Sequence, residues 1–246
     1  MEVLPQGGLL YFRAMPDEQH DLDLKEFLYT FVSEHKRELF EDVLKNRTRH
    51  FTVVLENIFQ PHNANAVLRT CEILGIQDIH IIEDRNPFHL SDAVTQGSAK
   101  WLDLHQYEQK DAVHSCTQQL KDEGYVLACA TPHADMFIEE LDISKPMAIC
   151  FGTELGGATE ELMDQCDVRF KIPMFGFTES YNISVSAALV LYELTSRVKN
   201  SKVDWKLSDM EKEAIRLVWA KRTVHEPDKL ERYFDEKRGS DAHSNG

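Results

Sequence analysis

Long apolar runs and paired cysteines are missing from this sequence of 246 residues. A helix that crosses a membrane needs about 20 consecutive, mainly apolar residues, and no stretch of the chain approaches that length. The apolar run at 9–12 is too short for the core of a signal peptide and is followed directly by Arg13. The five cysteines are odd in number, form no CxxC pair and lie mostly among apolar residues, which favours buried free thiols over disulfides or zinc ligands. We therefore expect a cytoplasmic protein that binds neither a membrane nor a metal.

The common nucleotide-binding and nucleophile motifs are absent as well. Without a GxGxxG turn, the sequence lacks the dinucleotide-binding signature and the glycine-rich turn of the common Rossmann methyltransferases. It contains no GxxxxGK[ST] phosphate loop, and Ser98 in QGSAK lacks the second glycine of a GxSxG elbow. The eleven histidines follow no metal-ligand spacing. These absences exclude the most familiar routes to nucleotide binding and acyl transfer.

Basic residues are scarce: the formal net charge is −15, and residues 51–198 alone hold 22 acidic and 9 basic side chains. So acidic a chain at first disfavours a nucleic-acid partner. The flanks differ, because KNRTRH at 45–50 and RLVWAKR at 216–222 contain basic residues and no acid. Short clusters of this kind are more often plain solvated faces. The candidates for contacts to RNA phosphates are Arg47, Arg49, Arg216, Lys221 and Arg222.

The middle of the chain does contain a regular alternation of short apolar runs with helix-like segments. The runs have strand character and lie at 52–58, 78–84, 125–131, 147–153 and 168–174. The helix-like segments lie around 64–74, 108–122, 159–166 and 182–198. Strands alternating with helices predict an α/β fold in which helices cover both faces of a parallel sheet.

Helical extensions are predicted on both sides of this region. Apolar residues at helical spacing within 22–44 predict one or two helices, and two more are expected at 208–222 and near 227–237. Residues 1–20 are expected to form a loose arm, and the polar tail at 239–246 to be disordered. The expected organisation is an N-terminal extension at 1–50, an α/β domain at 51–200 and a C-terminal extension at 201–246.

Three segments that follow predicted strands are rich in glycine, asparagine, serine or proline: ENIFQPHNANAVLRT, FGTELGG and PMFGFTESYNIS. In an open parallel sheet, ligands bind beyond the carboxyl ends of the strands. The candidate functional residues in these segments are Asn63, Arg69, Glu154, Ser180 and Asn182. Each has an ordinary alternative: Asn63 and Asn182 can cap the helices that follow them, Arg69 can pair with Glu72, and Glu154 can be a plain loop carboxylate.

Three motifs together resemble one known family. NANAVLRT at 63–70, FGTELGG at 151–157 and IPMFGFTESYNISVSAA at 172–188 are similar, in order and spacing, to the motifs of the SpoU/TrmH family in the SPOUT superfamily. The resemblance extends over about residues 50–200. The flanking helices, with WAKRTV at 219–224, look like the extensions of the tRNA guanosine methyltransferase branch. The resemblance implies a deep trefoil knot at the C-terminal end of the α/β domain, through which the last loop and helix pass.

Residue by residue, the resemblance also implies a site for S-adenosylmethionine. The family's cofactor-binding positions fall on Thr131, Gly152, Ile172 and Tyr181, with Leu155, Gly156 and Met174 as neighbours. Tyr181 stands where the family commonly has leucine, which changes the expected shape of the pocket. The catalytic and structural positions of the family fall on Asn63, Arg69, Glu154, Ser180 and Asn182.

The activity implied by the resemblance is methylation of a ribose 2′-hydroxyl in tRNA, with guanosine 18 of the D-loop as the expected target and a homodimer as the active form. Arg69 matches the residue proposed as general base, but a guanidinium has a pKa above about 12, so we expect Arg69 to clamp a phosphate while assisting proton removal. Asn63 and Ser180 would orient the ribose or phosphate, and Glu154 would hold the knot or the dimer interface. The alternatives are a ribosomal RNA methyltransferase of the same family and a non-catalytic RNA-binding knot protein.

Overall fold

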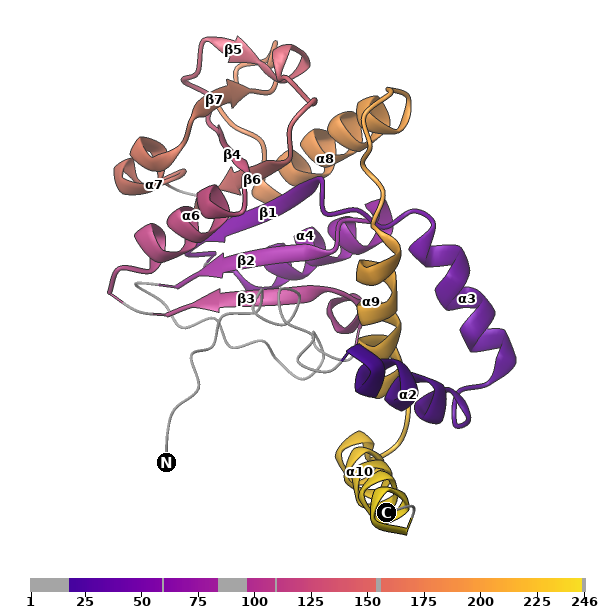
Figure 1. Cartoon of the computed structure of the whole chain (residues 1–246). Coiled ribbons are helices and arrows are strands. Elements are labelled where there is room, and N and C mark those ends of the chain that lie inside the picture. Colours follow the sequence, from indigo (N-terminus) through magenta and orange to yellow (C-terminus); the bar gives the residue numbers. More distant parts are fainter. Residues whose placement is uncertain (1–17, 59, 84–96, 109, 154–155, 245–246) are drawn as a thin grey trace. The chain divides into compact units, whose positions relative to one another are not determined.

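The computed structural model of the chain describes residues 18–58, 60–83, 97–108, 110–153 and 156–244 (Figure 1). The predicted arm at 1–20 lies almost wholly outside the described residues. Within them the chain forms two compact units, an α/β unit of residues 47–206 and a helical unit of residues 18–46 and 207–244. Each unit is described by itself.

A seven-stranded sheet forms the centre of the α/β unit, with the strand order β3-β2-β1-β6-β4-β7-β5 and parallel pairing throughout. The strands are β1 (Phe51–Glu56), β2 (Asp78–Ile82), β3 (Asp103–Tyr107), β4 (Val126–Ala130), β5 (Met136–Phe137), β6 (Met147–Phe151) and β7 (Val168–Lys171). The predicted parallel α/β fold is therefore confirmed. Two strands, β3 and β5, were not predicted, because DLHQY has only scattered apolar residues and β5 is two residues long.

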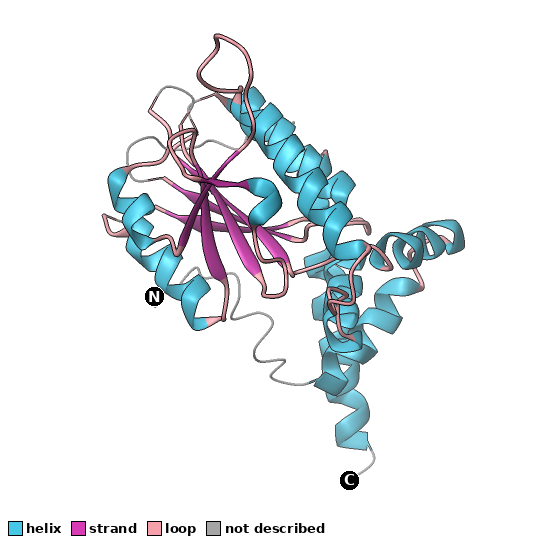
Figure 2. Ribbon diagram, turned by 90° about the horizontal axis from the view of Figure 1, so that it is seen from above, coloured by secondary structure: helices cyan, strands magenta, loops and turns pink. Residues whose placement is uncertain are grey.

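Helices cover both faces of this sheet (Figures 1 and 2). On one face lie α4 (Pro61–Leu74) and α8 (Ile183–Lys199), and on the other α6 (Ala112–Asp122) and α7 (Glu160–Gln165). Alternate residues of a strand serve opposite faces: Val53 and Leu55 join the cluster with α4 and α8, whereas Val54 joins the cluster with α6 and α7. This two-sided burial explains why β1 is buried at every position and is apolar at four of its six positions. Two short 3-10 helices, Ser98–Trp101 and Ile138–Glu140, complete the unit.

The helical unit joins segments from both ends of the described chain: α2 (Glu18–Tyr29), α3 (Glu34–Leu44), α9 (Asp209–Lys221) and α10 (Pro227–Ser244). Its core includes Phe40 and Trp219, whose rings meet edge to face with centroids 5.3 Å apart. Arg216 on α9 forms a two-pronged bond with Glu41 on α3, through Nε at 2.7 Å and Nη2 at 2.6 Å. The two sequence extensions therefore fold together.

The C-terminal tail differs from the prediction. We expected disorder at 239–246, but α10 continues to Ser244. Contacts with α2 explain why this helix forms: His20 bonds Asp235 at 2.8 Å, and the rings of Phe27 and Phe234 lie 5.4 Å apart. Once such packing nucleates a helix, each further residue adds a hydrogen bond at low cost. None of the described helices is both long and apolar enough to span a bilayer.

Candidate active site

A cavity of about 500 Å³ opens at the carboxyl ends of β4, β6 and β7. Its walls come from three segments: 130–133 at the end of β4, the described residues 151–153 and 156–158 at the end of β6, and the long connection from β7 into the start of α8. This is the edge of a parallel sheet at which ligands bind. Among the predicted residues, the cavity is lined by Thr131, Gly152, Gly156, Ile172, Met174, Ser180 and Tyr181. The structure thus brings together every described residue that the sequence assigned to a cofactor, while Glu154 and Leu155 lie outside the described residues.

Gly152 occupies a position where only glycine fits. A Cβ atom placed there would lie 2.0 Å from the Ala158 nitrogen and 2.1 Å from the Gly157 carbonyl carbon, far inside normal contact distance. The crowding arises because the chain turns back on itself: the Thr153 amide donates to the Gly157 oxygen at 2.9 Å, and the Gly157 amide to the Thr153 oxygen at 3.0 Å. Backbone therefore forms this wall of the cavity, as expected where a chain approaches a ligand closely.

Glu56 anchors the far end of this turn and was missed by the sequence reasoning. Its carboxylate is fully buried at the end of β1 and accepts hydrogen bonds from the amide and the hydroxyl of Thr159, the first at 2.8 Å. Thr159 in turn caps α7 by accepting from the Leu162 amide at 3.1 Å. The signal in the sequence was the single acid at the end of a mainly apolar strand. A carboxylate buried there needs hydrogen-bond donors close by, which marks it as a structural anchor.

Asn63 and Asn182 connect the starts of two neighbouring helices. The Asn182 side chain caps α8, accepting from the Ser184 amide at 2.9 Å, and its Nδ2 donates to Oδ1 of Asn63 at 3.4 Å. Asn63 is 3% exposed and donates to Oε1 of Gln60 at 3.2 Å. Asn182 therefore caps its helix, as one alternative predicted. Asn63 does not cap α4, because that helix begins two residues before it, with Pro61 in the first turn. Neither asparagine lines the cavity, so both fix the frame around it.

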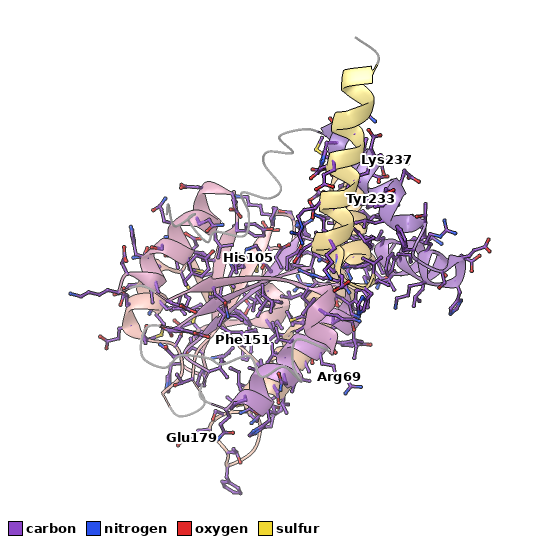
Figure 3. All side chains as sticks on the ribbon, turned by 90° about the horizontal axis from the view of Figure 1, so that it is seen from below. Arg69, His105, Phe151, Glu179, Tyr233 and Lys237 are labelled. Atoms are coloured by element: carbon purple, nitrogen blue, oxygen red, sulfur yellow. The ribbon has the colours of Figure 1, made fainter. Side chains whose placement is uncertain are left out.

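Arg69 is exposed on α4, and Figure 3 shows its side chain pointing away from the sheet. The alternative pairing with Glu72 does not occur, since Glu72 bonds to Arg47. Among the residues that the structure describes, Arg69 has neither an ion-pair nor a hydrogen-bond partner and does not line the cavity of its own chain. Its guanidinium is thus available to a ligand anion.

The predicted RNA contact of Arg47 is contradicted by burial. Arg47 is 1% exposed, and its guanidinium donates to the Ile76 carbonyl and to Glu72, both at 3.1 Å. Arg49 is nearly as enclosed, with Nε 2.7 Å from Asp78 and Nη2 2.9 Å from Asp103. A basic run in a sequence cannot reveal such pairing, because the acids lie 25 or more residues away.

The basic residues of the helical unit are less enclosed. Arg216 bonds Glu41 and Glu213, and Lys221 bonds Glu231 at 2.8 Å. Arg222, the residue after α9, is exposed. Among the five predicted cations, Arg222 therefore offers the most open surface to an RNA phosphate.

A buried polar network stiffens the opposite edge of the sheet. The rings of His80 and His105 stack with centroids 4.5 Å apart, and His105 Nε2 lies 2.9 Å from Asp78. Burial, aided by the neighbouring His105, lowers the pKa of His80 to about 3. His80 is therefore neutral at physiological pH and bonds the Tyr107 hydroxyl at 3.0 Å. In the described part of the chain no group of three or more potential ligands could hold a metal ion.

The cavity lies at the carboxyl ends of a parallel sheet, and residues of two of the three motif segments line it. Residues 50–192 match the SpoU rRNA Methylase family. The chain belongs to this family.

Known relatives cover most of the chain. The tRNA (guanosine(18)-2′-O)-methyltransferase of Borreliella burgdorferi is 42% identical over 198 residues, which are 80% of this chain and 89% of the relative. The enzyme of that name in Thermus thermophilus is 36% identical over 65% of this chain and 82% of its own. The crystal structure of the TrmH/SpoU tRNA modifying enzyme of Aquifex aeolicus matches with a TM-score of 0.69 and 25% identity, covering 78% of this chain and 98% of that chain.

Proposed function

We propose that the chain uses S-adenosylmethionine to methylate the ribose 2′-hydroxyl of guanosine 18 in tRNA. The observation that carries the proposal is the cavity lined by two of the three motif segments, FGTELGG and IPMFGFTESYNISVSAA, in a family member whose relatives bear the name of that activity. The relatives named for tRNA methylation match this chain over 89% and 82% of their own length, which favours tRNA over ribosomal RNA as the substrate. A formed cavity and an available Arg69 both favour catalysis over RNA binding alone.

The cavity suits the proposed cofactor in size and chemistry. A volume of about 500 Å³ lies within the range of sites for such ligands. Phe151, Met163 and Ile172 supply apolar wall for an adenine, and the backbone around Gly152 allows close approach. When bound there, S-adenosylmethionine supplies a methyl group already activated by its sulfonium. The protein's task is then to hold the 2′-hydroxyl in line and to give its proton a route.

Arg69 is suited to positioning rather than to proton abstraction. A guanidinium stays charged at any physiological pH, and its planar fork matches two phosphate oxygens. We propose that Arg69 clamps a phosphate next to the target ribose and stabilises the oxygen as its proton leaves. Ser180 lines the cavity and can hydrogen-bond the ribose, while Asn63 and Asn182 hold the two helix starts in place. For Glu154 the earlier hypothesis of a role in the knot or interface stays a prediction.

We further propose that the active form is a homodimer paired through α8. Val185, Leu189 and Tyr192 recur at helical spacing and are 44%, 43% and 67% exposed, an apolar stripe on a helix that otherwise packs on the core. Ile73, 69% exposed, lies on the adjacent α4, four residues beyond Arg69. Pairing along this stripe would place Arg69 at the interface, where it can serve the partner's cavity. Light scattering on Tyr192→Glu should report a monomer with little activity; an active monomeric wild type would contradict the proposal.

The proposed knot and location have separate support. The resemblance of 172–188 to the knotted motif favours a trefoil knot in the α/β unit. Stretching a single chain by its ends would test it, because a knot leaves the extended chain shorter than its contour length. The five cysteines are free thiols, which favours a reducing, cytoplasmic compartment.

The decisive experiment is methylation of unmodified tRNA transcripts with labelled S-adenosylmethionine. We expect one methyl group per tRNA, and none when guanosine 18 is replaced by its 2′-deoxy form. Ribosomal RNA fragments serve as the competing substrate. Methylation confined to those fragments, or unaffected by the 2′-deoxy replacement, would contradict the proposed substrate.

A further inference from the structure

Two phenylalanines on the connection between β7 and α8 are fully exposed. Phe175 and Phe177 have relative exposures of 99% and 108%, the largest of any bulky apolar side chain in the described residues. Burying a phenylalanine is normally favourable by roughly 25 cal/mol for every Å² removed from water. Two such rings, one residue apart and left entirely in solvent, therefore point to a partner that covers them.

These rings stand at the rim of the cavity. Met174, directly before Phe175, lines the cavity, and so do Glu179, Ser180 and Tyr181 just after Phe177. The Tyr181 hydroxyl donates to the Pro173 carbonyl at 3.3 Å and closes the base of the loop. Figure 3 shows this loop, marked by Glu179, projecting from the rest of the α/β unit. Because a residue spans at most about 3.6 Å, both rings are anchored within one or two residues of a cavity wall.

The chemistry of the loop favours a nucleobase as the partner. Its only charged residue is Glu179, so it cannot neutralise phosphates. Every unpaired base presents an aromatic face, and proteins that bind single-stranded RNA stack such faces on phenylalanine. A ribose whose 2′-hydroxyl is presented to the cavity carries its own base within a few ångströms of the rim. Gly176 between the two rings meets no atom within 4 Å of its added Cβ, so the loop has room to adjust to that base.

We propose that Phe175 and Phe177 form a stacking platform for unpaired bases of the substrate RNA at the methylated nucleotide. The inference rests on the proposed function and deepens it, because it states how an acidic protein holds its target without adding positive charge. The platform requires the target to be unpaired before transfer, which confines methylation to loops.

The test uses Phe175→Leu/Phe177→Leu, which keeps apolar bulk but removes both aromatic faces, with Phe137→Leu on β5 as the matched exposed control. Stacking on one base corresponds to roughly 5- to 150-fold in affinity. We expect the double variant to lose tRNA affinity and kcat/KM by a factor in that range, mainly through KM. Its affinity for S-adenosylhomocysteine and its mass by light scattering should be unchanged.

A second readout does not depend on turnover. In Phe177→Trp, with S-adenosylhomocysteine bound, tRNA should quench the new indole fluorescence relative to wild type, and activity should be retained. Unchanged tRNA affinity in the double variant, or an indole that does not respond to tRNA, overturns the inference. A double variant that dissociates to monomers also overturns it, because the rings then belong to a second copy of the chain. If the wild type methylates no tRNA, the proposed function fails, and the fluorescence titration still decides the platform.

Discussion

Replacing Gly152 with alanine should disable the cofactor cavity, and the structure sets the size of the effect. The added methyl carbon would lie 2.0–2.2 Å from three backbone atoms of Gly157 and Ala158. Ordinary contacts begin near 3.4 Å, so the turn would have to open by more than 1 Å, breaking the two bonds between Thr153 and Gly157. Overpacking of this kind costs about 1–3 kcal/mol and each lost bond about 1 kcal/mol. We expect a loss of about 3–5 kcal/mol in the free energy of unfolding.

Cofactor binding should suffer more than stability, because the displaced backbone is itself a wall of the cavity. Calorimetry with S-adenosylmethionine should show affinity lowered at least tenfold at a temperature where the variant is still folded. Gly176→Ala is the matched control, since its added Cβ would meet no atom within 4 Å and Gly176 does not line the cavity. If Gly152→Ala binds the cofactor and resists urea as well as Gly176→Ala does, the steric reasoning is refuted.

Three further predictions follow from the same geometry. Arg69→Ala should lower methyl transfer at least a hundredfold with cofactor affinity nearly unchanged, since Arg69 does not line the cavity; retention of most turnover would remove it from the mechanism. Arg222→Ala should weaken the binding of all tRNAs alike and reduce the salt slope of binding by about one unit; a slope equal to that of the wild type would exclude Arg222. Arg47→Ala should instead lower stability, because the Ile76 carbonyl and the partly buried Glu72 carboxylate lose this donor. The pKa of His80 is about 3 when folded against 6.5 when unfolded, so the unfolded chain takes up the proton first and stability should fall as pH drops from about 6.5 towards 3. The free energy of unfolding should fall by at most ~1.4 kcal/mol per pH unit. The urea midpoints of His80→Gln and of the wild type should therefore converge at low pH.

The sheet could be predicted where burial leaves a mark on the sequence. Strands buried on both faces are mainly apolar, which made β1, β2 and β6 recognisable as short apolar runs even though β1 and β2 each contain two buried polar residues. By contrast β3, at the edge of the sheet, pairs with β2 through DLHQY, and its polar residues join a buried network instead of facing solvent. Nothing local distinguishes that strand from a loop. Its stability depends on Arg49 and Asp78, which are distant in sequence.

The cavity loops were predictable for a related reason. Backbone that approaches a ligand needs small residues, so glycine and serine accumulate at the strand ends where the ligand binds. The role of each residue could not be derived in the same way. Asn63 and Asn182 were grouped with the catalytic set, yet they bond to each other and lie outside the cavity wall. Only the three-dimensional pairing separates a residue that fixes the frame from one that faces the ligand.

Charge shows the same limit, and it bears on how RNA is held. Arg47, Arg49 and Arg216 each lie within about 3 Å of a carboxylate, so the clusters that looked basic in sequence are largely neutralised inside the fold. A protein whose cationic side chains form internal ion pairs has few of them left to contact phosphates. The electrostatic field of its acidic residues also opposes the close approach of RNA. Much of the affinity must then come from contacts that carry no charge, in addition to those of Arg69 and Arg222. Stacking of bases on aromatic rings at the cavity rim is such a contact, and it acts only on nucleotides that are already unpaired. A surface with few available cations is thus matched by an exposed aromatic loop, so that selection of an unpaired target replaces general attraction to RNA.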